Sequence, residues 1–141
     1  MDKKMALSKK QIGLETSMVA NKLTDECIYV SLFGLLDSAR IEDVSKKITK
    51  ISESDKIVCV ILDLYNVDAI DTAVAGYINR LGNILKLMGI EPIICGIKAE
   101  LAEKMVKTDI YFSGIQIIRN LQDALLVSFK VTGYKLIKTE K

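Results

Sequence analysis

The chain has 141 residues, and half of them are hydrophobic, which is enough to build the core of a single domain. It carries 20 lysine and arginine residues against 18 aspartate and glutamate residues, so the formal net charge is +2. A surface that binds nucleic acid needs a clear basic excess, so we expect no nucleic-acid partner. Histidine is absent, which excludes Ser-His-Asp and Cys-His catalytic pairs.

The cysteines Cys27, Cys59 and Cys95 lie far apart in apolar runs. No two of them have the Cys-X-X-Cys spacing that is typical of metal sites. Their odd number and apolar surroundings predict buried, reduced thiols in a cytoplasmic protein. No hydrophobic run approaches membrane-spanning length, and residues 1–10 lack the apolar core of a secretory signal, so we expect no membrane partner.

The N-terminal part predicts a tail, a hairpin and a helix. Residues 1–16 are polar without a clear period, and we expect a flexible tail there. Residues 18–23 are a weak strand candidate, and residues 27–33 are rich in β-formers, so the short turn between them predicts an antiparallel hairpin. Asp37 can cap the following helix. Its apolar residues recur at helical spacing: Ile41, Val44, Ile48 and Ile51.

The centre of the chain predicts a buried strand and a second helix. Residues 57–62 are uninterrupted hydrophobics, which is typical of a strand buried on both faces, and we expect Asp63 to end it. Asp71 is the expected N-cap of the helix, and Gly89 suits the position just after its end. One apolar face of this helix consists of Val74, Ile78, Leu81, Leu85 and Met88.

The C-terminal part predicts a strand over residues 90–95, a short helix over 100–107 and a last strand over 115–118. Asn120 can cap a final helix. We expect a polar tail over residues 131–141. The inward-facing residues of the final helix are expected to be Leu121, Ala124, Leu125 and Phe129.

This order of elements predicts an α/β fold in a domain over residues 17–130. Strands that are connected through helices are expected to be parallel, with right-handed crossovers. We therefore expect a single mixed sheet, antiparallel at its N-terminal edge and otherwise parallel, with about four helices. Gly76 and Gly82 lie inside the second helix, where small residues permit close packing.

The pair Asp71-Thr72 places a hydroxyl at the expected start of a helix. A phosphoryl group on Thr72 would meet free backbone N–H groups and the positive end of the helix dipole. It would also add nearly two negative charges beside Asp68 and Asp71. The residue types alone leave a purely structural role open, because such pairs are common helix caps and aspartates are common turn formers. Asp63, Asp68 and Asp71 offer oxygen ligands for Mg²⁺, but their spacing matches no known metal signature, so we expect no metal.

The stretch from Ile61 to Ala75 resembles the signature of STAS domains, the family of anti-anti-sigma factors, also called anti-sigma factor antagonists. It is most similar to the scaffold and antagonist proteins of the stressosome. Residues 87–89, 95–102 and 120–125 support the resemblance, which covers residues 18–129. The resemblance implies the STAS fold and a regulator of transcription in the stress response that is not an enzyme and has no cofactor.

In the same way, the resemblance implies that a serine/threonine kinase of the anti-sigma-factor type phosphorylates Thr72. The switch loop that binds the partner would then comprise Asp68, Asp71, Thr72 and Ala73. A phosphatase is a further possible partner. Scaffold proteins of this group often carry a second phosphoacceptor threonine, and Lys104 occupies the matching position here.

Two alternatives remain open from the sequence. The domain can be mainly a structural protomer of a large assembly, in contact with copies of itself or with other STAS proteins. It can also be a module that binds a small ligand, a nucleotide or a lipid.

Overall fold

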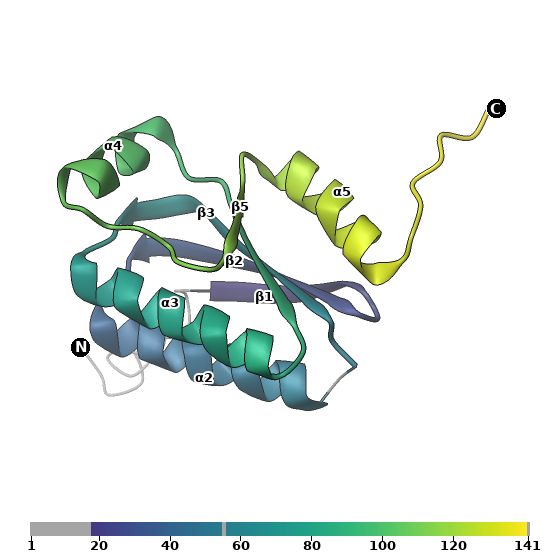
Figure 1. Ribbon diagram of the computed structural model, residues 1–141, viewed down its shortest axis with the longest axis horizontal. Coiled ribbons are helices and arrows are strands. Elements are labelled where there is room, and N and C mark those ends of the chain that lie inside the picture. The colour runs from purple at the N-terminus through teal and green to yellow at the C-terminus, as the bar shows by residue number, and fades with distance from the viewer. Residues whose placement is uncertain (1–17, 55, 141) are drawn as a thin grey trace, which may run out of the picture.

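The computed structural model describes residues 18–54 and 56–140, so the expected tail over residues 1–16 lies outside the described residues (Figure 1). The described part confirms the predicted class, a single mixed sheet with helices on its faces. The elements in chain order are β1 (Met18–Thr24), β2 (Cys27–Leu35), α2 (Ser38–Ser54), β3 (Cys59–Ala69), α3 (Thr72–Leu87), β4 (Glu91–Cys95), α4 (Ala99–Lys107), β5 (Gln116–Ile118) and α5 (Leu121–Thr132).

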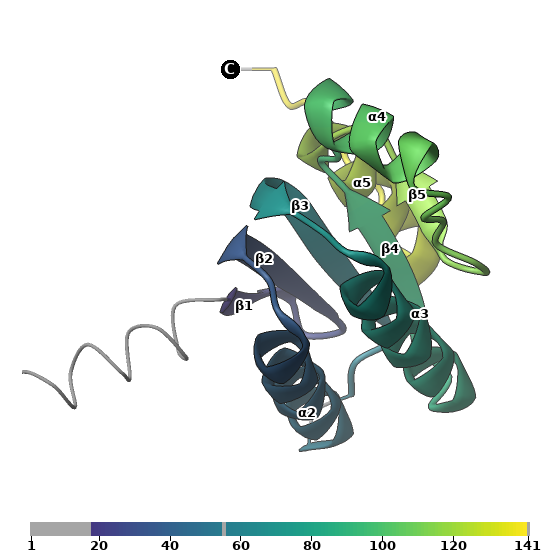
Figure 2. The same cartoon turned by 90° about the vertical axis from the view of Figure 1, so that its left-hand side faces the viewer.

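The five strands lie in the sheet in the same order as in the chain. β1 pairs antiparallel with β2, and the other neighbours pair in parallel, as expected. Right-handed crossovers that move along a sheet in one direction place their helices on the same face. Figure 2 shows α2 and α3 together on one face of the sheet, and α5, which follows the last strand, packs on the other.

The main core fills the space between the sheet and the helices α2 and α3. Ile41, Val44 and Ile48 of α2 are at most 1% exposed, as the predicted apolar stripe requires. A smaller core under α5 consists of Cys27, Cys59, Ile61, Ile93, Cys95 and Ala124. All three cysteines are buried and free, as predicted for the thiols. A hydrogen bond with Cys27, together with burial, raises the pKa of the Cys59 thiol.

The prediction that Asp63 ends its strand was wrong, because β3 continues to Ala69. β2 is also longer than expected, and its last residues pair with this extension, Gly34 with Val67 and Leu35 with Ala69. Irregularities in the register lie within the extension. They disturb the simple alternation of buried and exposed residues, so the polar extension looks like a loop in the sequence.

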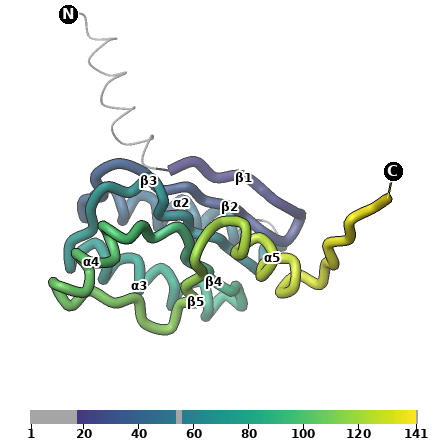
Figure 3. Tube along the Cα trace, turned by 90° about the horizontal axis from the view of Figure 1, so that it is seen from above, coloured from purple at the N-terminus to yellow at the C-terminus, as the bar shows by residue number. Residues whose placement is uncertain are grey.

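α3 ends where Gly89 predicts, but Met88 does not lie on its buried face, and α5 extends beyond residue 130. Met88 is 38% exposed, because α3 ends at Leu87 and Gly89 then turns the chain away with a φ of 79°. The final helix extends to Thr132, and the ring of Phe129 contacts that of Tyr134 with 6.4 Å between ring centroids. Phe129 is half-buried, and Ser128 next to it is fully buried, with its hydroxyl donating to the Leu125 carbonyl at 2.7 Å. Figure 3 shows the C-terminal segment leading away from the sheet beyond α5.

Among the described residues, no helix combines the length and the apolar character that crossing a membrane requires.

Candidate phosphorylation and partner-binding site

Asp71 is the N-cap of α3, as the sequence predicts. Its backbone is extended, with φ −97° and ψ 175°, and its side-chain Oδ1 accepts a hydrogen bond from the Val74 N–H at 2.7 Å. Its carbonyl accepts the first bond of the helix, from the Ala75 N–H at 3.0 Å. The cap therefore satisfies one of the N–H groups that the first turn of any helix leaves without a partner.

Thr72 is the first residue of α3, and its side chain is exposed. Its hydroxyl makes no hydrogen bond to any other described residue. The Asp71 carboxylate already lies at the positive end of the helix dipole, and the first turn beyond it contains no acidic side chain. The hydroxyl is thus available for reaction, at a position where a negative charge is tolerated.

Thr108 gives a useful contrast to Thr72. Its hydroxyl donates to the carbonyl of Lys104 at 2.8 Å, so it is engaged with its own helix. Lys104, which the resemblance aligns with a second phosphoacceptor, is exposed on α4 and pairs with Glu100 at 3.5 Å.

Buried residues on both sides hold Thr72 in place. Ile70 packs against the main core just before the cap. Val74 and Ile78 are fully buried, and Ala75 is 4% exposed. The start of α3 is therefore fixed to the core by apolar contacts, while Thr72 and Ala73 face solvent.

The four predicted residues of the switch loop lie together at the end of β3 and the start of α3. Asp68, Asp71, Thr72 and Ala73 are all exposed. Asp63 does not join them, because it is buried at 6% exposure. Within the described part of the chain, no three His, Cys, Asp or Glu side chains form a group that could hold a metal ion.

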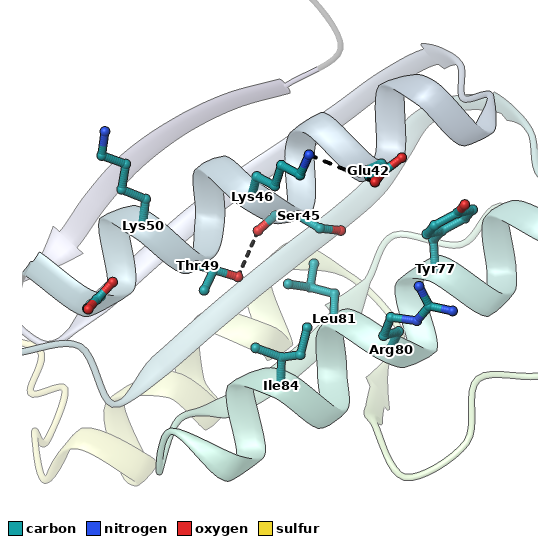
Figure 4. A pocket seen from close by; sticks show the side chains of 10 residues that line it. Glu42, Ser45, Lys46, Thr49, Lys50, Tyr77, Arg80, Leu81 and Ile84 are labelled. Carbon is teal, nitrogen blue, oxygen red and sulfur yellow. Dashed lines mark hydrogen bonds and ion pairs between the residues drawn. The ribbon is translucent and has the colours of Figure 1, made fainter.

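A groove of about 450 Å³ between α2 and α3 extends the exposed surface (Figure 4). Tyr77, Arg80 and Ile84 line it from α3, and these residues follow Ala73 at spacings of four, three and four, so they share one helical stripe with it. This groove was not predicted from the sequence. The helical spacing of these α3 residues can be read from the sequence, but the distance between α3 and α2 cannot.

The groove has an apolar floor and a rim with charges of both signs. Leu81 and Ile84 form part of the floor. On α3, the guanidinium of Arg80 lies 5.3 Å from the ring centre of Tyr77. On α2, Lys46 pairs with Glu42 at 3.9 Å (Figure 4). An apolar floor inside a polar rim is the usual composition of a protein-binding surface.

The mixed sheet has crossover helices on one face and a capped, exposed start of α3, which defines a small α/β domain. The family model described as "STAS domain" matches residues 18–124. The chain therefore belongs to the STAS domain family, which confirms the resemblance.

Among curated proteins, the chain is 30% identical over 118 residues to the RsbT co-antagonist protein RsbRD of Bacillus subtilis (strain 168), covering 84% of this chain and 42% of that protein. The chain thus spans less than half the length of the curated relatives it matches.

Solved structures share the fold at low identity. A single-residue variant of RsbS from Moorella thermoacetica has a TM-score of 0.68 at 16% identity, covering 82% of this chain and 97% of that one. The anti-sigma factor antagonist SpoIIAA in its unphosphorylated form has a TM-score of 0.65 at 15% identity, covering 84% of this chain and 99% of that one.

Proposed function

We propose that this chain is a non-enzymatic, cytoplasmic regulator of the anti-sigma factor antagonist and stressosome type, and that phosphorylation of Thr72 switches its partner binding. The observation that carries the proposal is the exposed Thr72 hydroxyl, unengaged by other described residues, at the start of α3. Family membership and the curated relatives support the type of regulator.

The partner would dock on the switch loop and the adjoining groove between α2 and α3. A phosphoryl group on Thr72 adds nearly two negative charges beside Asp68 and Asp71. The first turn of α3 stabilises these charges, so the fold persists. The partner meets a strongly negative surface in place of a neutral hydroxyl, and it is released.

The relatives' names give RsbT as the protein that they co-antagonise. We propose a partner of that type for this chain, a serine/threonine kinase that resembles anti-sigma factors. It would transfer the γ-phosphoryl group of ATP to Oγ1 of Thr72, releasing ADP and the hydroxyl proton. A phosphatase would hydrolyse the phosphoester and restore the binding surface. Other STAS proteins would be further partners in an oligomeric assembly.

Phosphosite mapping tests the modification. The full chain is incubated with the kinase and ATP, and peptides are analysed by tandem mass spectrometry. We expect one phosphate on Thr72 and none on the Thr72→Ala variant. Thr108→Ala is the matched control, because Thr108 lies in another part of the chain and its hydroxyl is engaged, and we expect full modification of that variant. An unmodified Thr72, or equal modification of Thr72→Ala, would refute the proposal.

A further inference from the structure

A second pocket, of about 390 Å³, lies on the opposite face of the sheet from the groove. Ser31, Asp63, Cys95 and Ile118 are neighbours across the strands β2 to β5. α5 begins at Leu121, just after this row, and packs on Cys27, Cys59 and Ile61, which precede the row along their strands. The pocket lies where α5 begins, and Asp63, Tyr65 and Leu121 are among its lining residues.

Asp63 is a buried carboxylate, and no basic side chain of the described residues lies within ion-pair distance of it, although Lys98 and Arg119 line the same pocket. Asp63 is 6% exposed, and none of the ion pairs between described residues includes it. Tyr29 donates its hydroxyl to Oδ2 at 2.6 Å, and the Tyr65 N–H donates to Oδ1 at 3.0 Å. Burial and the neighbouring Asp63 carboxylate raise the pKa of the Cys95 thiol, so this thiol also lies against the carboxylate. The carboxylate oxygens can still accept a further bond. Because buried charges are normally paired, a cationic group in the pocket would complete this site.

Gly96 shows that the backbone makes room for this carboxylate. Its φ is +78°, and a Cβ built there would collide with Oδ1 of Asp63 and lie 3.0 Å from the Tyr65 nitrogen. Any larger residue would push into the Asp63 side chain and the Tyr65 backbone. The geometry around Asp63 thus depends on two segments of the chain that are distant in sequence.

The rim of the pocket has the opposite charge. Lys98 lies with its ammonium 5.2 Å from the ring centre of Tyr65. Arg119 is exposed and makes no hydrogen bond or ion pair with the rest of the described chain. Beside Arg119, Asn120 caps α5 by accepting from the Asp123 N–H at 2.8 Å, so the positive helix end also faces this region. The rim therefore suits a carboxylate, which arginine binds through two parallel hydrogen bonds.

We propose that this pocket binds a small zwitterion of the free amino acid class. Its ammonium group pairs with Asp63, and its carboxylate pairs with Arg119 beside the start of α5. An aliphatic side chain packs against Leu121, Ile97 and the Tyr65 ring, which form an apolar wall of the pocket. An ammonium is preferred to a hydroxyl because only a charged donor supplies the missing counter-ion.

Calorimetric titration of the full chain tests this, with L-leucine as the first probe and the other common amino acids as a panel at millimolar concentrations. Two matched probes each lack one charge, 3-methylbutylamine without the carboxylate and 4-methylpentanoate without the ammonium. We expect binding of L-leucine or another panel member, and binding of its truncated analogues that is weaker by about tenfold or more. No binding by any amino acid would refute the proposal, and so would equal binding of the truncated probes.

Variants locate the site. Asp63→Asn and Arg119→Ala should each weaken amino acid binding by about tenfold or more. Lys130→Ala, at the other end of α5, is the control and should bind as wild type does. Circular dichroism shows whether Asp63→Asn folds; if it does not, Arg119→Ala decides, because Arg119 is exposed and contacts no described partner. Unchanged binding in Arg119→Ala would overturn the proposal.

Discussion

At the scale of single residues, Asp71 and Thr72 are neighbours with separate roles. The Asp71 carboxylate is occupied by the Val74 N–H at 2.7 Å, whereas the Thr72 hydroxyl has no bond to another described residue. The sequence was sufficient to predict this arrangement, because a helix cap depends on a few adjacent residues. It was not sufficient to place Asp63, whose burial depends on Tyr29 and Gly96 from other strands and loops.

Replacing Asp71 by alanine should lower the free energy of unfolding by about 1 kcal/mol, because the Val74 N–H loses its acceptor. Urea unfolding followed by circular dichroism measures this change. Asp71→Asn retains a side-chain oxygen at the cap and should stay closer to wild type. If the alanine variant were as stable as wild type, the capping role would be wrong.

Replacing Tyr29 by phenylalanine should lower the free energy of unfolding by about 1–3 kcal/mol at neutral pH, because the buried carboxylate of Asp63 loses a donor. Burial, together with the hydrogen bond to Asp63, raises the pKa of Tyr29 from 10.0 to about 12. The folded protein thus favours the neutral phenol. The hydrogen bond of the Tyr29 phenol contributes fully to stability when the pH is below the pKa that Tyr29 has in the unfolded chain. This contribution is lost as the pH rises through the higher pKa that Tyr29 has in the folded protein.

The difference in stability between wild type and Tyr29→Phe should therefore narrow between pH 10 and about pH 12. Every other titratable group is present in both proteins, so the difference between their stabilities isolates Tyr29. Unfolding free energies measured across this range test the prediction. A difference that stays constant with pH would show that the bond to Asp63 does not control the titration of Tyr29.

At the scale of elements, local signals predicted most helices and strands, and long-range pairing explains the failures. The caps Asp37, Asp71 and Asn120 all begin helices, as expected, because cap chemistry is local. The extension of β3 to Ala69 depends on pairing with the end of β2, which no local pattern shows. The outward position of Met88 likewise depends on where the chain turns after α3.

The glycines of α3 give a paired test of packing. Gly76 is exposed, and a Cβ added there would meet nothing within 4 Å, so Gly76→Ala should raise the free energy of unfolding by about 0.5–1 kcal/mol through helix propensity. A Cβ at Gly82 would lie 2.5 Å from Cδ1 of Ile115. Gly82→Ala should therefore be less stable than Gly76→Ala, since Ile115 must move. Thermal unfolding of both variants measures this, and equal stabilisation would contradict it.

At the scale of the whole molecule, β3 connects two sites on opposite faces of the sheet. It carries Asp63 toward the face covered by α5, and it leads into the cap of α3 beside the groove of the other face. The mixed character of the sheet was predictable, because strands that are joined through helices run parallel. Neither pocket was predictable, because each is lined by elements that are separated in the chain, such as Lys98 and Arg119 around Asp63.

The central claim is that phosphorylation of Thr72 releases a partner. The most direct measurement is the dissociation constant of the kinase for this chain before and after modification, obtained by calorimetry with the same preparation of each protein. We expect affinity to fall by about tenfold or more on phosphorylation, because like charges at an interface cost several kcal/mol. Equal affinity of the phosphorylated and unmodified chains would contradict the account.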